Sequence, residues 1–335
     1  MKILFTPENG FIKETYFPPD ALVWLERTGE VVYNPKESPF TGTELSEAIR
    51  NVDICVTHWG CPTFTASVLE SANQLKLIAH AAGSVGDLLT EAVFQKSIKV
   101  CSANRVLAKY VAESVLADIL AGLRLIPLLD QTMKKRLSAG KTIYASRSLF
   151  GAKIGLVGLG AIGFYLLDLL APFDVQIKVY DPYLPAAALE GYPNVELCPL
   201  DEALRWGEII SIHASLTPET HGLIDAGKLK QIRDGALFVN TARGAIVDEN
   251  ALTRELQQGR LSAVLDVFTV EPLPLESSLR DLDNVILLPH VAGITSREQM
   301  SYAMIEEIER YANGQPLLHE IPVEKFLLMT RERDS

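Results

Sequence analysis

The stretch KIGLVGLGAIGFYLLDLLAPFDVQIKVYD, from Lys153 to Asp181, decides the fold. A short apolar run, Ile154 to Val157, is followed by Gly158, Gly160 and Gly163 in G-x-G-x-x-G spacing. In that spacing the first glycine allows a tight turn, the second lets the backbone approach a pyrophosphate, and the third allows close packing of helix and strand. The pattern therefore predicts a buried parallel strand, a turn, and a helix whose N-terminus faces the phosphates of a dinucleotide.

The residues after the glycines extend this prediction to a particular cofactor. The helix would begin at Ala161 and Ile162, and a second apolar run, Val175 to Tyr180, ends in Asp181, 18 residues after Gly163. An acid about 20 residues beyond the glycines accepts hydrogen bonds from the adenosine ribose and repels a 2′-phosphate. We therefore predict NAD(H) rather than NADP(H). The alternative is a glycine-rich turn in which the acid is an ordinary strand-end carboxylate.

Length and composition narrow the class of protein. A chain of 335 residues predicts two domains, and no apolar run reaches the roughly 18 residues of a membrane-spanning helix. The N-terminus, MKILFTPENG, is typical of a first strand rather than a signal peptide. A net charge of −11 argues against nucleic acid as a partner. The four cysteines have no metal-ligand spacing and indicate thiols in a reducing cytoplasm.

Short apolar runs alternate with helical patterns along most of the chain. This alternation is typical of parallel sheets covered by helices on both faces. Among the helices, we expect one from Thr43 to Arg50, with Thr43 as N-cap, and one long helix from Asn104 to Ile126. Ligands bind such sheets at the loops that follow the strands.

Two loops near the N-terminus follow strand-like runs. His58-Trp59-Gly60-Cys61 follows VDICVT, and Gly83-Ser84-Val85-Gly86 comes shortly after LKLIAH. Small residues allow backbone N–H groups to point at a carboxylate, so the second loop is a candidate substrate loop. The alternative is a plain tight turn. We expect His58 and His80, both near strand ends, to be packed histidines.

Reactive side chains also follow three strand-like runs downstream of the glycines. These side chains are Arg243, Asp266 with Glu271 just beyond it, and His290. The carboxyl ends of parallel strands share an edge of the sheet, so we expect them to gather there. Arginine presents a rigid charged fork to a carboxylate and a carbonyl. Histidine exchanges a proton near neutral pH, and a nearby carboxylate orients its ring and favours its charged form. This set suits hydride transfer at a 2-hydroxy acid.

Four blocks resemble a known family, the D-isomer-specific 2-hydroxyacid dehydrogenases. They are GLVGLGAIG (155–163) with the Tyr-Asp-Pro that ends the next strand, NTARG (240–244), LDVFTVEP (265–272) and PHVAG (289–293). The resemblance implies an α/β fold with two doubly wound parallel-sheet domains. A Rossmann NAD domain (104–296) would be inserted into a flavodoxin-like substrate domain (1–103 with 297–335). The resemblance also implies a homodimer. Because the chain stops soon after Pro322, we expect the short form of the family, without a C-terminal regulatory domain.

The resemblance implies roles for individual residues. Arg243 would hold the substrate carboxylate and carbonyl, His290 would be the general acid/base, and Glu271 would be its partner, while Asp266 would hold the nicotinamide amide. The residues expected to bind NAD are Gly158, Gly160, Ala161, Ile162, Gly163, Asp181, His213, Ala214, Thr241, Ala242, Arg243, Asp266, His290 and Gly293. Those expected to contact the small 2-oxo or 2-hydroxy acid are Trp59, Gly83, Ser84 and Val85. No metal is expected.

The chain departs from the family pattern at places that bear on function. Ser215 stands where the cofactor loop commonly has proline, and Trp59 lies in the loop where phosphoglycerate-specific members carry arginine. We therefore place 3-phosphoglycerate low among the candidate substrates. Formate dehydrogenases resemble this family in fold but typically have glutamine in the place of Glu271. A second alternative is a corepressor-like protein that binds NAD(H) and partner proteins without significant turnover. The choice of 2-hydroxy acid stays open.

Overall fold

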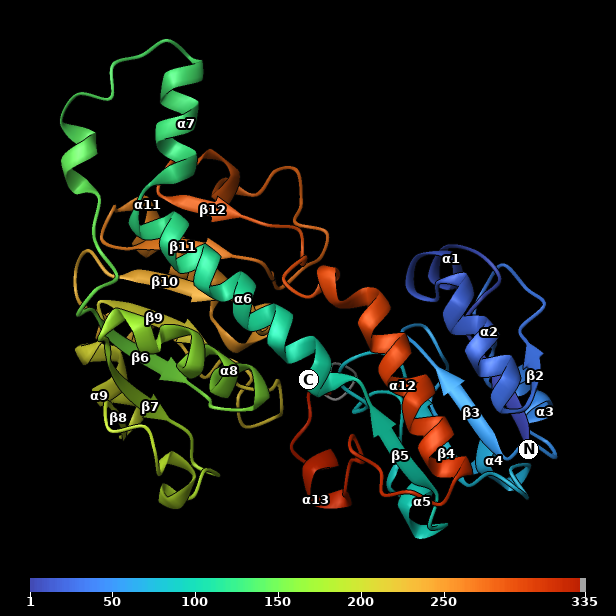
Figure 1. Ribbon diagram of the computed structural model, residues 1–335. Coiled ribbons are helices and arrows are strands. Elements are labelled where there is room, and N and C mark those ends of the chain that lie inside the picture. The colour runs from blue at the N-terminus through green and yellow to red at the C-terminus, as the bar shows by residue number, and fades with distance from the viewer. Residues whose placement is uncertain (332–335) are drawn as a thin grey trace. The chain divides into compact units, whose positions relative to one another are not determined.

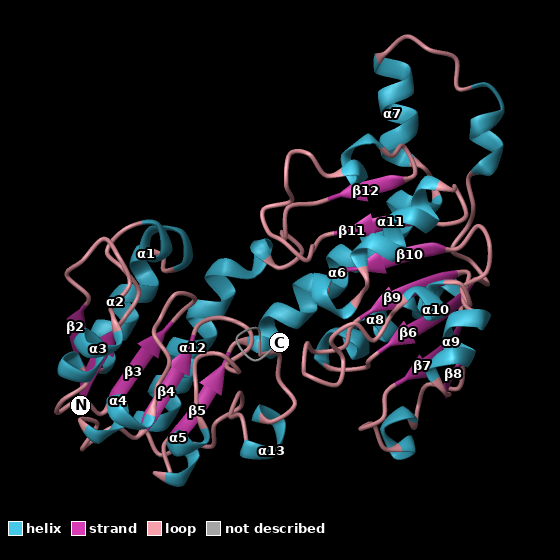
Figure 2. Ribbon diagram, turned by 180° about the vertical axis from the view of Figure 1, so that it is seen from behind, coloured by secondary structure: helices cyan, strands magenta, loops and turns pink. Residues whose placement is uncertain are grey.

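The computed structural model describes residues 1–331 and divides into two compact units (Figure 1). The terminal unit comprises Met1–Ala108 and the chain from Ile294 onward, and the central unit comprises Lys109–Gly293. Each unit is built around one parallel β-sheet with helices on its faces (Figure 2). The predicted fold class, two doubly wound parallel-sheet domains, is confirmed.

The sheet of the terminal unit has five parallel strands in the order β2-β1-β3-β4-β5. This is the flavodoxin-like order 2-1-3-4-5. Its strands are β1 (Lys2–Phe5), β2 (Glu30–Tyr33), β3 (Ile54–Thr57), β4 (Leu77–His80) and β5 (Lys99–Ser102). The strand order reverses between β1 and β3, so the loops after these strands open at the carboxyl edge where such sheets bind ligands.

Alternate residues of each strand in the terminal unit face opposite layers of helices. Ile3 and Phe5 pack with the apolar sides of α2 and α12, whereas Leu4 packs with α3 and α4 on the other face. This period of two is what a strand buried on both faces requires. The helices are α1 (Phe11–Tyr16), α2 (Pro19–Thr28), α3 (Gly42–Ala48), α4 (Ala66–Glu70), α5 (Glu91–Gln95), α12 (Arg297–Ala312) and α13 (Val323–Phe326).

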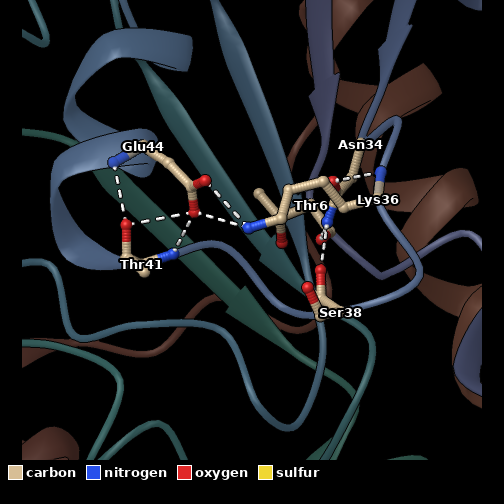
Figure 3. Close-up of polar contacts among 6 residues, drawn as sticks. All are labelled: Thr6, Asn34, Lys36, Ser38, Thr41 and Glu44. Carbon is tan, nitrogen blue, oxygen red and sulfur yellow. Dashed lines mark hydrogen bonds and ion pairs between the residues drawn. The ribbon is translucent and has the colours of Figure 1, made fainter.

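The start of α3 differs from the sequence prediction. Thr41, not Thr43, is the N-cap, because its hydroxyl accepts the N–H of Glu44 at 3.3 Å (Figure 3). The Glu44 carboxylate in turn accepts a hydrogen bond from the N–H of Thr41 at 2.8 Å. It also forms an ion pair with Lys36 at 2.8 Å. This reciprocal arrangement is a capping box. It fixes the loop that leads from β2 into α3.

The sheet of the central unit has seven parallel strands in the order β12-β11-β10-β9-β6-β7-β8. The chain order reverses between β6 and β9, which is the switch point at which a Rossmann sheet binds a dinucleotide. Its strands are β6 (Lys153–Val157), β7 (Gln176–Tyr180), β8 (Val195–Leu197), β9 (Ile209–Ile212), β10 (Leu237–Asn240), β11 (Ser262–Leu265) and β12 (Val285–Leu287).

Helices cover both faces of this second sheet as well. Phe238 and Leu265 face the core formed with α9, α10 and α11, whereas Leu237 and Val264 point the other way and meet Gly122 of α6. The helices are α6 (Asn104–Leu123), α7 (Ile126–Lys134), α8 (Ala161–Leu170), α9 (Leu200–Trp206), α10 (Ala226–Leu229) and α11 (Glu249–Gln257). Short 3₁₀ turns are η1 (Gly140–Ala145), η2 (Ala171–Phe173), η3 (Ala186–Leu189), η4 (Gly244–Ile246), η5 (Ser278–Asp281) and, in the terminal unit, η6 (Ile294–Ser296).

The predicted long helix from Asn104 to Ile126 is in fact two helices. α6 ends at Leu123, and Leu125 adopts a left-handed conformation with φ of +53° before α7 begins. Pro127 lies in the first turn of α7, where its missing N–H costs nothing. Among residues 1–331 no helix is both long enough and apolar enough to cross a membrane.

Candidate active site

The glycine motif forms the turn between β6 and α8 in the central unit. Gly158 has φ of +87°, and a side chain there would bring its Cβ within 2.6 Å of the backbone nitrogen of Ala214. Glycine is required because the loops after β6 and β9 touch at this point. A Cβ on Gly160 would meet nothing within 4 Å, so the N-terminus of α8 is open. Gly163 makes room for the Leu159 side chain, which would lie 2.7 Å from its Cβ, rather than for a strand.

Asp181 lies at the end of β7, as predicted, and turns back to the glycine turn. Its Oδ2 accepts the N–H of Leu159 at 2.8 Å, and its Oδ1 accepts the N–H of Tyr183 at 2.9 Å. These two bonds fix the carboxylate beside the start of α8. Ala161 and Ile162 begin the first turn of that helix, whose N–H groups have no partner within the helix and can bind an anion.

The loop after β9 is braced by side chains. His213 is buried, its Nε2 lies 2.9 Å from the Ser211 hydroxyl, and burial lowers its pKa to about 4, so its ring is neutral. Farther along, the Thr220 hydroxyl donates to the Ser215 carbonyl at 2.6 Å and accepts the N–H of Thr217 at 2.8 Å. These two bonds brace the loop beside Ser215, where the family commonly has proline.

The loop after β10 carries Arg243 and is shaped by Asn240. The Asn240 side chain accepts the N–H of Ala242 at 3.1 Å and donates to the Arg243 carbonyl at 3.0 Å. The Arg243 guanidinium donates to the Ala242 carbonyl at 2.7 Å. Thr241 is 7% exposed, and its buried hydroxyl has no partner within residues 1–331. A hydroxyl left in this state at a strand end is the kind of group that a ligand satisfies.

Glu271 and His290 are brought into direct contact. Glu271 Oε2 lies 2.7 Å from His290 Nδ1, and Glu271 Oε1 accepts the N–H of Phe268 at 3.0 Å. Because an ionised carboxylate only accepts hydrogen bonds, the Nδ1 atom carries the proton and Nε2 is left for exchange with a substrate. The His290 side chain is 44% exposed, so the ring is accessible.

Asp266 holds the loop that presents His290. Its two carboxylate oxygens accept the N–H groups of Val291 at 2.8 Å and Ala292 at 2.9 Å, and its carbonyl accepts the N–H of His290 at 2.8 Å. These bonds stabilise His290 at a φ of +55°, a conformation that non-glycine residues rarely adopt. Burial raises the pKa of Asp266, and the two backbone bonds act in the opposite direction.

These residues fit a dinucleotide across the carboxyl edge of the central sheet. The open glycine turn and the start of α8 suit a pyrophosphate, Asp181 suits a ribose, and the unsatisfied Thr241 hydroxyl lies after β10 on the other side of the switch point. No group of three or more potential metal-ligating His, Cys, Asp or Glu side chains occurs in the described part of the chain.

In the terminal unit, Trp59 lies on the loop after β3. Its side chain is 44% exposed, and its ring packs against His58 at 4.7 Å and Tyr16 at 5.7 Å between ring centroids. His58 and His80 are both buried, and burial lowers the pKa of each to about 3. They are therefore packed neutral histidines, as predicted, and Trp59 presents an aromatic surface at the carboxyl edge.

The predicted substrate loop is only partly available to a ligand. Val85 is fully buried in the core beneath the loop, so a substrate contact by its side chain does not fit the structure. The Ser84 hydroxyl donates to the Thr330 carbonyl at 3.0 Å and accepts the N–H of Gly86 at 3.1 Å. Through the bond to Thr330, the C-terminal segment supports this loop. Gly83 and the backbone around it remain candidates for binding a carboxylate.

Three residues that the sequence prediction missed belong to the site. Asn240 shapes the Arg243 turn, and its place at the end of a buried strand is the signal that was available. Glu249, in α11, accepts the N–H of Thr269 at 2.8 Å and braces the Glu271 loop. Asp118, in α6, is buried and lies close enough for the charge of Asp266 to act on it.

Comparison with known proteins identifies the family. The NAD binding domain of the D-isomer specific 2-hydroxyacid dehydrogenases matches residues 116–292. D-3-phosphoglycerate dehydrogenase of Methanocaldococcus jannaschii is 34% identical over 300 residues, which cover 88% of this chain but 56% of that protein. The chain thus spans about half the length of this relative. Glyoxylate reductase of Thermofilum pendens is 34% identical over 279 residues, which cover 81% of each chain. The crystal structure of TT0316 protein from Thermus thermophilus superimposes with a TM-score of 0.78 at 28% identity, over 96% of this chain and 100% of that one. The chain belongs to the D-isomer-specific 2-hydroxyacid dehydrogenase family.

Proposed function

We propose that this protein is an NAD-dependent D-2-hydroxyacid dehydrogenase that also works as a 2-oxo acid reductase. The observation that carries the proposal is the 2.7 Å contact between Glu271 and His290, on a loop held by Asp266. Arg243 follows β10, the strand next to β11, on the same edge of the sheet. Glutamate at position 271 argues against a formate dehydrogenase.

The protein's own groups would handle the proton and the charge. Bound NAD(H) would supply or accept the hydride at C2 of the substrate. His290 Nε2 would give its proton to the carbonyl oxygen during reduction and take it back during oxidation. Glu271 would keep the ring in the tautomer with hydrogen on Nδ1 and stabilise the imidazolium. The Arg243 guanidinium would hold the substrate carboxylate and the oxygen on which negative charge develops.

The cofactor proposed is NAD(H) in preference to NADP(H). Asp181, fixed by the N–H groups of Leu159 and Tyr183, would accept hydrogen bonds from the ribose and repel a 2′-phosphate. Asp266 would hold the nicotinamide amide. The remaining proposed contacts are Gly158, Gly160, Ala161, Ile162, Gly163, His213, Ala214, Thr241, Ala242, Arg243, His290 and Gly293.

The substrate proposed is a small 2-oxo or 2-hydroxy acid without a phosphate group. Relatives include proteins named for glyoxylate and for 3-phosphoglycerate. In this chain the half-exposed Trp59 offers an aromatic surface and no positive charge, which favours the unphosphorylated class. Gly83 and Ser84 would bind through the loop backbone. In functional terms, residues 1–103 with 297–335 would form the substrate domain and residues 104–296 the NAD domain.

Two further properties complete the proposal. The four cysteines carry free thiols, which is consistent with work in a reducing cytoplasm. The protein would also form a homodimer through the central unit. Its α7 and the following segment project beyond the sheet (Figure 1) and expose apolar side chains, among them Met133, Leu137 and Tyr144. Apolar side chains gathered on such a surface mark a contact with another protein.

The test is consumption of NADH, followed by absorbance, with glyoxylate, hydroxypyruvate, pyruvate, phenylpyruvate, branched-chain oxo acids and phosphohydroxypyruvate. We expect turnover with at least one unphosphorylated acid, and much less with NADPH in place of NADH. His290→Ala should lose most turnover, roughly a factor of 10² to 10⁴, while it still binds NADH. Glu271→Gln should lose less, because glutamine can keep the ring in place without stabilising its charge.

The same assay separates the alternatives. Turnover by His290→Ala equal to that of the parent would refute the assigned acid/base. Binding of NADH without turnover of any acid, together with NADH-dependent capture of a partner protein, would instead support the corepressor-like alternative.

A further inference from the structure

Asp118 is a buried acid that the proposed mechanism does not use. It lies in α6, is 8% exposed, and one of its oxygens is buried without a partner in the described chain. Gly122, one turn later on the same face of α6, lies against Leu237 and Val264 of β10 and β11. Figure 1 shows that α6 runs antiparallel to these two strands, so Asp118, one turn before Gly122 on the same helix face, lies nearer their carboxyl ends. An unpartnered buried carboxylate is costly, and so it is a candidate for a functional role.

The charge that acts on Asp118 is the negative charge of Asp266. Both oxygens of Asp266 accept backbone N–H groups, which favour its charged form, whereas one oxygen of Asp118 has no such bond among the described residues. Burial and the negative charge of Asp266 raise the pKa of Asp118 to about 7. Two acids whose surroundings separate their titrations in this way take different roles. Asp118 is thus the one that gains and loses a proton near neutral pH.

The pair lies on the nicotinamide side of the switch point. The glycine turn after β6 and Asp181 after β7 belong to the half of the sheet that binds the adenosine. The other nucleotide of a dinucleotide would then lie over the carboxyl ends of β9, β10 and β11, and Asp266 directly follows β11. This placement rests on the proposed function of the chain as an NAD-dependent enzyme.

We propose that Asp118 is a positioning residue that acts through Asp266 and makes the preference of the site for oxidised over reduced cofactor depend on whether Asp118 is ionised. The oxidised nicotinamide ring carries a positive charge and the reduced ring is neutral. An ionised Asp118 adds a second negative charge beside Asp266, which favours the oxidised ring. A protonated Asp118 removes this charge, which favours the reduced ring.

Other charged groups lie near Asp118 and Asp266, and their effect on the cofactor preference has to be separated from that of Asp118. His290, after β12, and Glu271, after β11, both act on Asp266. Arg243, after β10, is a further charged residue on the same edge of the sheet. Loss of the His290 proton would also favour the oxidised ring, so it would imitate the effect of Asp118. The experiment therefore uses a background in which this imidazole is absent.

The dissociation constants of NAD⁺ and NADH are measured between pH 6.0 and 8.5 by calorimetry, in His290→Ala and in His290→Ala with Asp118→Asn. In His290→Ala we expect the ratio Kd(NADH)/Kd(NAD⁺) to rise about fivefold with pH, the size expected for one charge that is strongly screened by solvent. With Asp118→Asn the ratio should stay constant near its low-pH value, because asparagine imitates the protonated acid. Asp118→Leu should also give a constant ratio if charge is the cause.

Asp234→Asn in the His290→Ala background is the matched control. It removes an exposed acid of the same unit at the opposite edge of the sheet, just before β10, so the rise should persist. An equal rise with Asp118→Asn would overturn the inference while leaving the proposed function intact. If His290→Ala bound neither cofactor form, and the parent chain also bound neither, the proposed function would fail and this inference with it.

Discussion

Two single residues, His58 and His80, make the terminal unit sensitive to acid. Both are buried after adjacent strands, and burial lowers the pKa of each to about 3. An unfolded chain protonates histidine near pH 6.5, so it binds more protons than the folded chain between about pH 6.5 and 3. Stability is therefore present above about pH 6.5 and is lost as the pH falls. Between pH 7 and 5 each histidine should reduce the free energy of unfolding by about 2 kcal/mol.

Urea unfolding at pH 7.0 and 5.0, followed by tryptophan fluorescence, measures this loss. His58→Leu removes one titrating group of similar size, so the loss between the two pH values should shrink by about 2 kcal/mol. His221→Leu replaces an exposed histidine and should leave the loss unchanged. A loss of equal size in His58→Leu and the parent would show that His58 is not held neutral by burial.

For single residues, the sequence predicted which side chains form the candidate site better than it predicted their burial and their neighbours. The Glu271–His290 contact could be expected because two loops after neighbouring parallel strands must meet at one edge. The role of Asp118 could not be expected, since it is one of several polar residues in a largely apolar helix and nothing in the sequence shows that it faces Asp266. The burial of Val85 could not be predicted either, because a short loop has no hydrophobic periodicity that separates buried from exposed positions.

Among the elements, the cap of α3 offers a direct test. Thr41 accepts the N–H of Glu44, whereas Thr43 makes no capping bond. Thr41→Ala leaves an N–H of the first turn without a partner and should lower the free energy of unfolding by about 1 kcal/mol. Thr43→Ala is the matched control, because it is the same substitution two residues away, and it should change stability by a few tenths of a kcal/mol.

Urea unfolding of the two variants at pH 7 compares them with the parent chain. Equal losses for Thr41→Ala and Thr43→Ala would mean that the capping box in Figure 3 does not hold α3. The sequence favoured Thr43 because it stands immediately before the helical pattern. It could not reveal that Gly42 is already helical and that Glu44 reaches back to Thr41.

The break between α6 and α7 shows a second limit at the scale of elements. The sequence is apolar and helical from Asn104 to Ile126, and a leucine in the left-handed conformation has no sequence signal. The strand-like runs were located more reliably, since each is a short apolar run that ends in a loop. In the structure VDICVT, LKLIAH and the run from Val175 to Tyr180 lose one or two residues at their first ends, where the boundary of a strand is least certain from sequence.

For the molecule as a whole, alternation and one glycine motif were sufficient to predict two parallel-sheet units. The strand order 2-1-3-4-5 and the reversal between β6 and β9 depend on which strands pair, and the sequence period cannot itself show that. The resemblance to the family added the flavodoxin-like and Rossmann classes and the expectation that one domain is inserted into the other. Self-association is a property that neither a period nor a single chain displays.

The proposed homodimer therefore needs its own experiment. Met133 is 68% exposed and Tyr144 is 83% exposed on the segment that projects from the central unit. Exposure of such apolar side chains to water is unfavourable, so their burial against a second copy would stabilise a dimer. We expect the parent chain to sediment at twice the mass of one chain, and Met133→Ser with Tyr144→Ser to sediment as a monomer. Phe11→Ser is the matched control, because it removes a side chain that is 70% exposed on the terminal unit, and it should leave the dimer intact.

Dissociation is expected to leave NADH binding in place, since the proposed cofactor contacts come from one chain. A parent chain that sediments as a monomer at micromolar concentration would exclude the dimer. Dissociation by Phe11→Ser, with the central-unit variants still dimeric, would assign the contact to the terminal unit.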